Sequence, residues 1–230
     1  MGPARVTAVR HGESEANVAY ARAGDAPLVY GFGDDEVGLT ARGRSQAEAL
    51  GRRLAALPGS ESPELVWSSP YLRAVQTWEV ARSAWCGEPP PVLVDERLRD
   101  VENGLLARLN PAAVRERFPE EAARLLAEGP YVYRPPGGES FADVVARLRA
   151  FLAELAVRAD GRRVLLVAHD SVILGLRHAI AGTPDGEEAA AGASAPVLSV
   201  PVLNASVSTW HAVRGRLEIV AFNDTSHLDA

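Results

Sequence analysis

The amino-acid sequence predicts an α/β fold: a three-layer α/β/α sandwich with a mostly parallel central sheet and an antiparallel edge. Two observations predict this architecture. Short apolar, β-branched segments alternate along the chain with longer segments whose apolar residues recur at helical spacing. The last two strand-like segments, residues 206–213 and 217–222, are joined by Arg214-Gly215-Arg216, which favours an antiparallel hairpin.

The first part of the chain contains one buried strand, one capped helix and one long helix. Residues 6–9 are apolar and β-branched, which predicts a strand, and Ser14 can cap the helix that follows it. Residues 24–38 carry many glycines and aspartates and are typical of a loop. Thr40 begins a long amphipathic helix, which is expected to end at Pro58.

The middle of the chain adds two further short strands, at residues 65–67 and 92–94. Pro70 suits the first turn of the helix between them. Residues 95–110 are charged and irregular. A single helix is then expected from residue 111 to about residue 127.

The last part of the chain carries the strongest patterns. The clearest amphipathic helix spans residues 140–159, and the strongest buried strand spans residues 163–168, followed by another helix. Residues 183–195 are rich in glycine, alanine and acidic side chains, which predicts a mobile loop. The sequence contains no internal repeat, and we expect residues 1–230 to form a single domain.

The composition is that of an ordinary globular protein, with 47% hydrophobic and 23% charged residues. A formal net charge of -6 gives the chain no general attraction to nucleic acid or anionic membranes, so neither is expected as a partner. Cys86 is the single cysteine and cannot form an intrachain disulfide, which fits a reducing compartment. The sequence shows neither a ~20-residue apolar span nor a signal peptide, so we expect a cytoplasmic protein.

Polar side chains with phosphate-binding chemistry follow three of the predicted strands. In open α/β sheets, ligands bind at the carboxyl ends of the strands, so these side chains are expected to converge. The planar arginine guanidinium can donate to two phosphate oxygens at once. The three strand ends supply Arg10, His11 and Glu13, then Ser68, Ser69 and Arg73, and finally His169 and Asp170.

Two histidines and two arginines in one crevice indicate a pocket for a multiply charged oxyanion. A neutral imidazole, with an ordinary pKa of ~6.5, is a good nucleophile toward phosphorus at neutral pH. Covalent catalysis through such a histidine would divide phosphate transfer into two easier steps. The arginines would neutralise the transferred oxygens, and a general acid would protonate the leaving oxygen.

Residues 10–17, which begin with Arg10-His11-Gly12, closely resemble the signature of the histidine phosphatase superfamily, which includes the phosphoglycerate mutases. Six further segments resemble other motifs of this family in the same order: residues 39–47, 68–77, 98–104, 136–140, 167–169 and 223–228. The resemblance covers nearly the whole chain. It implies a phosphoglycerate mutase-like fold and favours the phosphatase branch of the superfamily.

The resemblance also implies a role for each matching residue. His11 would be the nucleophile that becomes a phosphohistidine. Arg10, Arg73 and His169 would bind the phosphoryl group, and Asn17 would line the pocket beside it.

The sequence leaves the proton donor open. Asp100 lies where the family commonly has a glutamate, and aspartate is shorter by one methylene. Some branches of the family use an aspartate directly after the second histidine, which here is Asp170. Glu96 and Glu102 are nearby alternatives. We rank Asp100 first and Asp170 second.

Substrate contacts are expected beyond the phosphate site. Glu13, two residues after the nucleophile, and Asp170 are candidates. Arg134, with Tyr131 and Tyr133, could form a wall of the pocket, or it could pack against the proline turn that follows.

The sequence does not name the substrate. Specificity is expected to lie in residues 24–38, in residues 102–136 and in the loop after residue 181, because loops carry most binding residues.

The sequence therefore predicts a metal-independent, histidine acid phosphatase-like phosphomonoesterase that acts on a small phosphorylated metabolite and needs no cofactor. The other histidines, His178, His211 and His227, lack metal-ligand spacing. One alternative is a phosphoglycerate mutase, but mutases resemble one another in a pair of arginines where this chain has only Arg134. The other alternative is a phosphate-binding protein without turnover. An exposed edge strand could also pair two chains as a homodimer.

Overall fold

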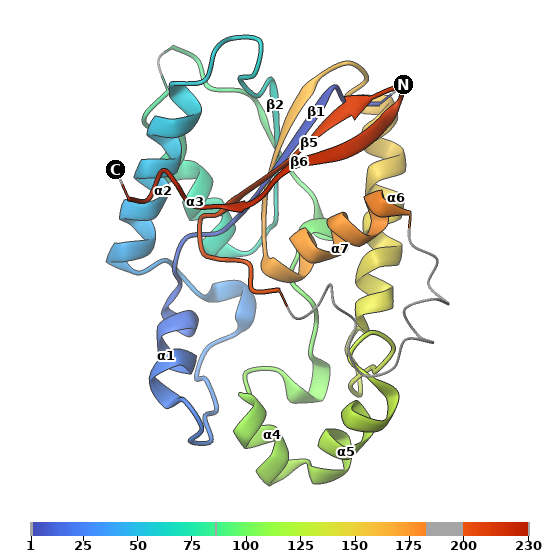
Figure 1. Cartoon of the computed structure of the whole chain (residues 1–230). Helices are drawn as coiled ribbons and strands as arrows, with labels where there is room; N and C mark the ends of the chain where they lie inside the picture. Colours follow the sequence, from blue (N-terminus) through green and yellow to red (C-terminus); the bar gives the residue numbers. More distant parts are fainter. Residues whose placement is uncertain (1, 86, 183–199, 230) are drawn as a thin grey trace.

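The computed structural model describes residues 2–85, 87–182 and 200–229, and it confirms the predicted fold class. Within these residues, six strands form one sheet in the order β3-β2-β4-β1-β5-β6, with helices on both faces (Figure 1). The strands are β1 (Arg5–Arg10), β2 (Leu65–Ser68), β3 (Val92–Val94), β4 (Arg163–Ala168), β5 (Val207–Val213) and β6 (Arg216–Asp224).

Four neighbouring strands, β3, β2, β4 and β1, run parallel to one another. β5 runs antiparallel to β1 and to β6, so the predicted antiparallel hairpin is confirmed. Arg214 and Gly215 form its tight turn and have positive φ angles of 50° and 82°. Two consecutive residues of this kind give a turn whose twist matches that of the flanking strands.

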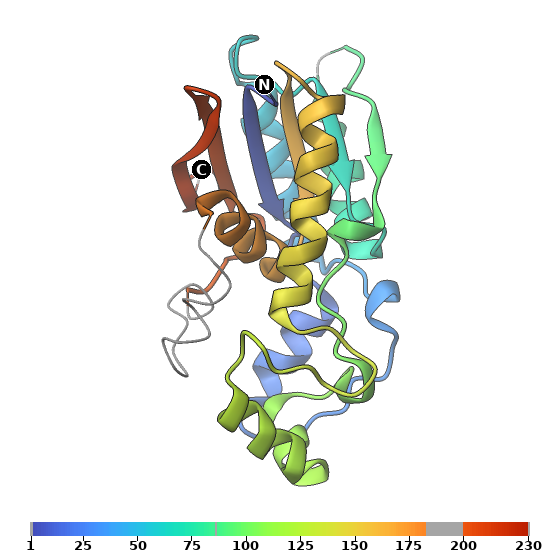
Figure 2. The ribbon, with the colours of Figure 1, turned by 90° about the vertical axis from the view of Figure 1, so that its right-hand side faces the viewer.

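Each face of the sheet has its own hydrophobic core, because successive residues of a strand point to opposite faces. Leu166 packs with α6 and α7 on one face, whereas Leu165 packs with α2 and α3 on the other. Figure 2 shows α6 (yellow) and α7 (orange) on one side of the sheet. The four flanking helices are α2 (Ala41–Ala55), α3 (Leu72–Arg82), α6 (Phe141–Arg158) and α7 (Asp170–Ala181).

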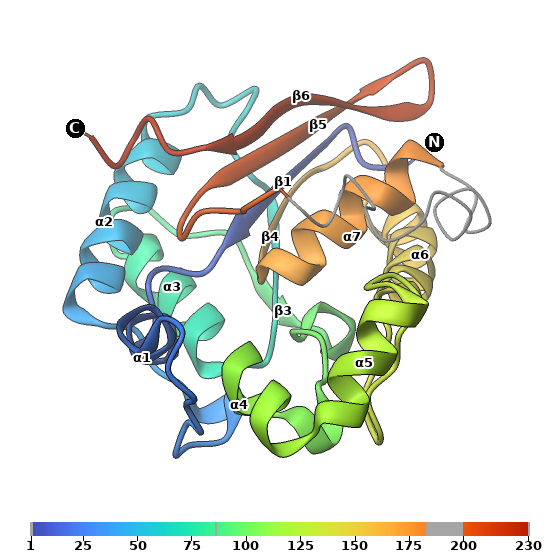
Figure 3. The same ribbon diagram turned by 60° about the horizontal axis from the view of Figure 1, so that its bottom comes forward.

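Three shorter helices lie beyond the carboxyl ends of the parallel strands (Figure 3). Ser14 caps the first of them as predicted: its Oγ accepts the N–H of Asn17, and the side chain of Asn17 accepts the N–H of Ser14. These helices are α1 (Glu15–Ala23), α4 (Pro111–Arg117) and α5 (Pro119–Glu128).

The single helix expected from residue 111 to about residue 127 is in fact two helices, α4 and α5. Phe118 separates them with φ −133° and ψ 59°. Pro119 explains the break, because its ring disfavours a helical conformation at the preceding residue and it has no N–H for a continuous helix. The long helix that begins after Thr40 is also shorter than expected and ends at Ala55, before Pro58.

The helix expected to include Pro70 in its first turn begins later, at Leu72. Tyr71 has an extended backbone, with φ −66° and ψ 135°, and its N–H donates to Oγ of Ser69 at 3.2 Å. This local hydrogen bond keeps residues 69–71 as a turn. The turn carries Arg73 into its position at the start of α3.

The irregular segment at residues 95–110 is confirmed, although it contains two short 3₁₀ helices, Glu96–Leu98 and Gly104–Leu106. The loop predicted at residues 183–195 lies outside the described residues. Among the helices that the structure describes, none is both long enough and apolar enough to cross a membrane.

Candidate active site

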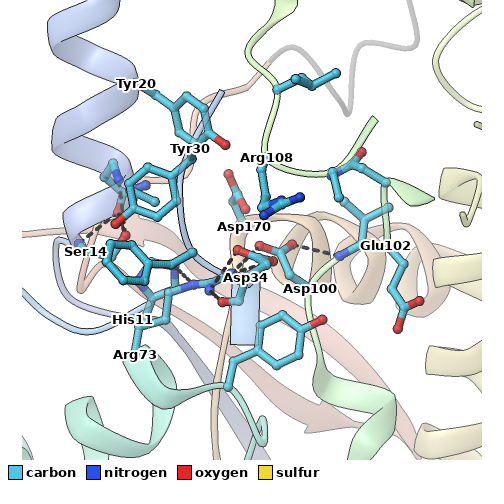
Figure 4. Close-up of a pocket in the computed structure, with 18 of the residues that line it drawn as sticks. His11, Ser14, Tyr20, Tyr30, Asp34, Arg73, Asp100, Glu102, Arg108 and Asp170 are labelled. Atoms are coloured by element: carbon cyan, nitrogen blue, oxygen red, sulfur yellow. Dashed lines mark hydrogen bonds and ion pairs between the residues drawn. The ribbon is translucent and has the colours of Figure 1, made fainter. Parts of the chain in front are cut away.

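The strand ends singled out in the sequence meet in one pocket at the carboxyl edge of the sheet (Figure 4). The pocket has a volume of about 430 Å³. Six of the residues expected at the site line it: Arg10, His11, Asn17, Arg73, Asp100 and Asp170. A seventh, His169, lies directly behind His11, with the two ring centroids 5.2 Å apart.

The hydrogen bonds of the buried His11 assign its tautomer. Nδ1 lies 2.7 Å from the carbonyl oxygen of Gly12, which can only accept, so Nδ1 carries the proton. Nε of Arg73 can only donate and lies 3.1 Å from His11 Nε2, so Nε2 presents a lone pair. Burial, together with the charges of Arg73 and Arg10, lowers the pKa of His11 well below its usual value. The imidazole is therefore neutral at physiological pH.

Arg73 is buried, and each of its three nitrogens has a partner. Nε donates to His11. One terminal nitrogen donates to the carbonyl oxygen of Asp34 and lies 3.0 Å from its Oδ1. The other donates to Asp34 Oδ2 at 3.2 Å and to Asp100 Oδ2 at 3.0 Å. Arg73 thus connects His11 to two carboxylates.

The second histidine, His169, is fully buried. Its Nε2 lies 2.8 Å from Oγ of Ser69, and its Nδ1 lies 3.5 Å from Oδ2 of Asp100. Burial lowers the pKa of His169 to about 3 even though the negative charge of Asp100 opposes this shift. Both histidines of the pocket are therefore neutral in this structure.

Asp100 is a partly exposed carboxylate with donors at both oxygens, and 18% of its side chain is exposed. Ser171 Oγ donates to Oδ1 at 2.6 Å, and the N–H of Val101 donates to the same oxygen at 2.9 Å. Burial alone would raise the pKa of Asp100, but the charge of Arg73 and these hydrogen bonds hold it well below its usual range. Asp100 is ionised throughout the physiological pH range.

Asp170 is the first residue of α7, and its pKa is shifted in the opposite direction from that of Asp100. Its side chain is 44% exposed within the pocket, and the nearest cation is Arg10, whose terminal nitrogen lies 3.6 Å from Oδ2. Desolvation by the pocket walls, followed by the negative charge of Asp100, raises the pKa of Asp170. Neighbouring carboxyl groups with pKa values shifted in opposite directions indicate that one is an anion and the other a proton donor.

Asn17 is held with its amide nitrogen available to the pocket. Its Oδ1 accepts hydrogen bonds from the N–H of Ser14 at 3.1 Å and from Nδ2 of Asn204 at 3.0 Å. Because the oxygen is occupied, Nδ2 is the group that Asn17 can offer to a bound anion.

Two residues that were expected to contact the substrate, Glu13 and Arg134, lie outside the pocket. Glu13 lies outside the pocket because the turn after His11 directs it to the start of α2, where its Oε1 accepts a hydrogen bond from Thr40 Oγ1 at 2.8 Å. Arg134 is also outside the pocket, because it pairs with Asp143 at the start of α6.

The other two candidate proton donors differ in position. Glu96 does not line the pocket, whereas Glu102 does. Glu102 is 48% exposed and pairs with Arg99, with Oε1 2.7 Å from Nε.

Two of the three segments expected to determine specificity line the pocket, whereas the loop after residue 181 lies largely outside the described residues. The loop after α1 contributes Tyr30 and Phe32, whose ring centroids are 5.9 Å apart, and Tyr20 of α1 lies 6.1 Å from Tyr30. The segment before α4 contributes Arg108, which the sequence did not single out. No periodic pattern marks Arg108, and its signal is conformational: it has a φ of 66°.

Fold and site together define a class: an α/β protein in which two histidines and two arginines surround an anion pocket, with a neutral imidazole at its centre. The chain belongs to the histidine phosphatase superfamily (branch 1), whose family model matches residues 6–225. The resemblance inferred from the sequence motifs is confirmed.

Relatives with similar sequences include phosphatases and a mutase. The chain is 28% identical to phosphoserine phosphatase 1 of Hydrogenobacter thermophilus over 221 residues, which cover 96% of this chain and 92% of that protein. It is 31% identical to the 2,3-bisphosphoglycerate-dependent phosphoglycerate mutase of Rhizobium etli over 174 residues, 75% of this chain and 78% of the mutase. It is 30% identical to 6-phosphofructo-2-kinase/fructose-2,6-bisphosphatase of Aquarana catesbeiana over 175 residues, but it spans only 31% of that relative.

Several solved structures share the fold of this chain. YhfR of Bacillus stearothermophilus superimposes with a TM-score of 0.77 at 27% identity, covering 97% of this chain and 98% of that chain. A mycobacterial glucosyl-3-phosphoglycerate phosphatase gives a TM-score of 0.70 at 29% identity, covering 95% and 98%.

Proposed function

We propose that this protein is a metal-independent phosphomonoesterase that transfers the phosphoryl group of a small metabolite to Nε2 of His11 and then to water. The observation that carries the proposal is the hydrogen-bond geometry of His11. Gly12 holds the proton on Nδ1, and the lone pair of Nε2 lies beside the guanidinium of Arg73. A neutral imidazole fixed in this orientation is prepared for nucleophilic attack on phosphorus.

In the first step, a bond forms between His11 Nε2 and phosphorus while the bond from phosphorus to the leaving oxygen breaks. Arg10 and Arg73 neutralise charge on the transferred oxygens, and Asn17 offers a further hydrogen bond, whereas His169 lies behind His11 and does not line the pocket. Fixed donors of this kind supply most of the catalysis in phosphoryl transfer.

Asp170 donates the proton that the leaving oxygen needs. Its raised pKa keeps a larger share of the carboxyl protonated, whereas Asp100 is held ionised. This reverses the ranking drawn from the sequence. Asp100 instead acts through its neighbours, because it holds Arg73 and approaches His169.

In the second step, water attacks the phosphohistidine and the bond between phosphorus and Nε2 breaks. The ionised Asp170 accepts the proton of the attacking water. Inorganic phosphate leaves, His11 is again neutral and Asp170 is again protonated. The same carboxyl group thus serves first as the acid and then as the base.

The test is phosphate release from a panel of phosphorylated metabolites by the wild type and by His11→Ala. The matched control is His227→Gln, because His227 contacts Arg53 outside the pocket. We expect the wild type and the control to release phosphate, with or without a chelator, and His11→Ala to lose at least about 10³-fold in rate. Activity that requires added metal, or that survives in His11→Ala, would contradict the proposal.

The similarity to a phosphoglycerate mutase gives a second candidate function. A mutase would return the phosphoryl group to another hydroxyl of the bound intermediate instead of passing it to water. Incubation with 3-phosphoglycerate distinguishes the two. A phosphatase accumulates inorganic phosphate, whereas a mutase accumulates 2-phosphoglycerate.

A further inference from the structure

Arg108 has an unusual backbone conformation in the wall of the pocket. Its φ of 66° lies in the left-handed region, which residues with a Cβ atom seldom adopt. Such a conformation persists only where the surrounding structure imposes it, and it is enriched at ligand-binding positions.

The surrounding hydrogen bonds show what imposes this conformation. The carbonyl oxygen of Arg108 accepts the N–H of Tyr30 at 2.7 Å. Two residues further on, the buried Asn110 accepts the N–H of Leu28 and the N–H of Ala113, both at 2.9 Å. These bonds tie the segment of Arg108 to the loop that carries the aromatic wall. The start of its side chain is therefore fixed in position.

The guanidinium of Arg108 has no acidic partner in the part of the chain that the structure describes. Among the residues that the structure describes, none forms an ion pair or hydrogen bond with its guanidinium. The pocket carboxylate closest to it in sequence, Glu102, pairs with Arg99 instead. Figure 4 shows Arg108 inside the pocket, between Tyr30 on one side and Glu102 on the other.

We infer that Arg108 binds a carboxylate on the leaving group, so that the preferred substrates are phosphomonoesters of small hydroxy acids. This inference rests on the proposed function, in which Arg10 and Arg73 already neutralise the phosphoryl group. Arg108 then adds one charge and a planar pair of N–H donors, which match a planar, singly charged carboxylate. A pocket of about 430 Å³ suits a small ester.

The experiment uses two pairs of substrates that differ in the carboxylate. The first pair is O-phosphoserine and O-phosphoethanolamine. The second pair is 3-phosphoglycerate and glycerol 3-phosphate. The measured quantity is the ratio of kcat/KM within each pair, and the wild type is expected to favour the carboxylate about 10- to 100-fold.

The variant is Arg108→Gln, because glutamine bears the same backbone strain at this φ and removes only the charge. We expect the ratio to fall toward one in both pairs. The matched control is Arg117→Gln, an exposed arginine of α4 that does not line the pocket, and it should keep the wild-type ratio. A wild-type ratio near one, or an unchanged ratio in Arg108→Gln, would overturn the inference.

A binding measurement separates this inference from the proposed function. Titration calorimetry with His11→Ala compares 3-phosphoglycerate with glycerol 3-phosphate in a protein that cannot be phosphorylated on His11. Tighter binding of 3-phosphoglycerate that is lost when Arg108→Gln is added supports the carboxylate site, even if the wild type hydrolyses neither ester. Equal binding of the two ligands refutes the site, whatever the catalytic activity.

Discussion

The carboxylate of Asp34 spans both terminal nitrogens of Arg73, with Oδ1 3.0 Å from one and Oδ2 3.2 Å from the other. This is the two-point geometry with which an arginine binds phosphate. Because Nε of Arg73 is bonded to His11, a phosphoryl group must displace Asp34 to gain two donors. Asp34 lies on the loop after α1 and is 46% exposed, so it can leave without opening the core.

Replacing Asp34 with asparagine should strengthen phosphate binding. The substitution keeps a similar shape but removes the negative charge that competes for Arg73. We expect the inhibition constant for inorganic phosphate to fall about 3- to 10-fold at neutral pH, a modest effect because the side chain is partly exposed. Asp35→Asn, at the exposed neighbouring residue, is the control. An unchanged or higher inhibition constant would show that Asp34 does not compete.

The contact between Asp34 and Arg73 also predicts how phosphate inhibition depends on pH. Burial raises the pKa of Asp34, although Arg73 opposes this shift. As the pH falls through this raised pKa, Asp34 becomes protonated and its hold on Arg73 weakens. The difference in phosphate inhibition between the wild type and Asp34→Asn should therefore shrink toward acid pH. A constant difference from pH 4 to pH 8 would argue against titration of Asp34.

The roles of Asp170 and Asp100 can be separated by the leaving group. Asp170→Asn should lower kcat about 10²- to 10³-fold for an alkyl ester such as O-phosphoserine. The loss should be much smaller for p-nitrophenyl phosphate, because nitrophenolate leaves without a proton. Asp100→Asn should slow both substrates to a similar extent, since Asp100 acts through Arg73 and His169. The opposite pattern would identify Asp100 as the donor.

The shifted pKa values also fix the pH window of the reaction. His11 must be neutral, so activity is lost only as the pH falls through its lowered pKa. Asp170 must be protonated, so activity is lost as the pH rises through its raised pKa. We expect kcat/KM for an alkyl ester to be highest on the acid side of neutrality. The basic limb of the profile should disappear in Asp170→Asn, and its persistence there would assign that limb to another group.

The turn that carries His11 depends on a close helix contact. A Cβ atom on Gly43 of α2 would overlap the carbonyl oxygen of Glu13. Gly43→Ala should therefore displace this turn, lower the melting temperature by about 4–10 °C and reduce kcat. Gly59→Ala is the control, because a Cβ atom there meets nothing within 4 Å. Equal melting temperatures for the two variants would contradict this account.

The convergence of His11, Arg73 and His169 could be predicted from the sequence, because each follows a strand and parallel strands end at the same edge of the sheet. The opposite pKa shifts of Asp100 and Asp170 could not. The pKa of Asp100 depends on Arg73 and Ser171, and these contacts exist only in the folded chain.

Sequence patterns also do not identify which other residues line the pocket. Glu13 and Arg134 were expected at the substrate from their place in the sequence, yet turn geometry directs Glu13 to α2 and Asp143 holds Arg134. Arg108 lies in a segment without periodicity. Its conformation is imposed by hydrogen bonds with a loop about 80 residues earlier in the chain, such as the bond from Tyr30.

The pairing of β1 with β4 makes the geometry of the candidate site depend on the number of residues in each strand as well as on their types. Arg10 pairs with Ala168, so each histidine is the residue directly after the last pair of this ladder. Insertion or deletion of one residue in either strand would reverse the facing of every later side chain and carry one imidazole away from the other. Substitutions that keep apolar volume in these strands should be tolerated, whereas differences in length should be confined to the loops.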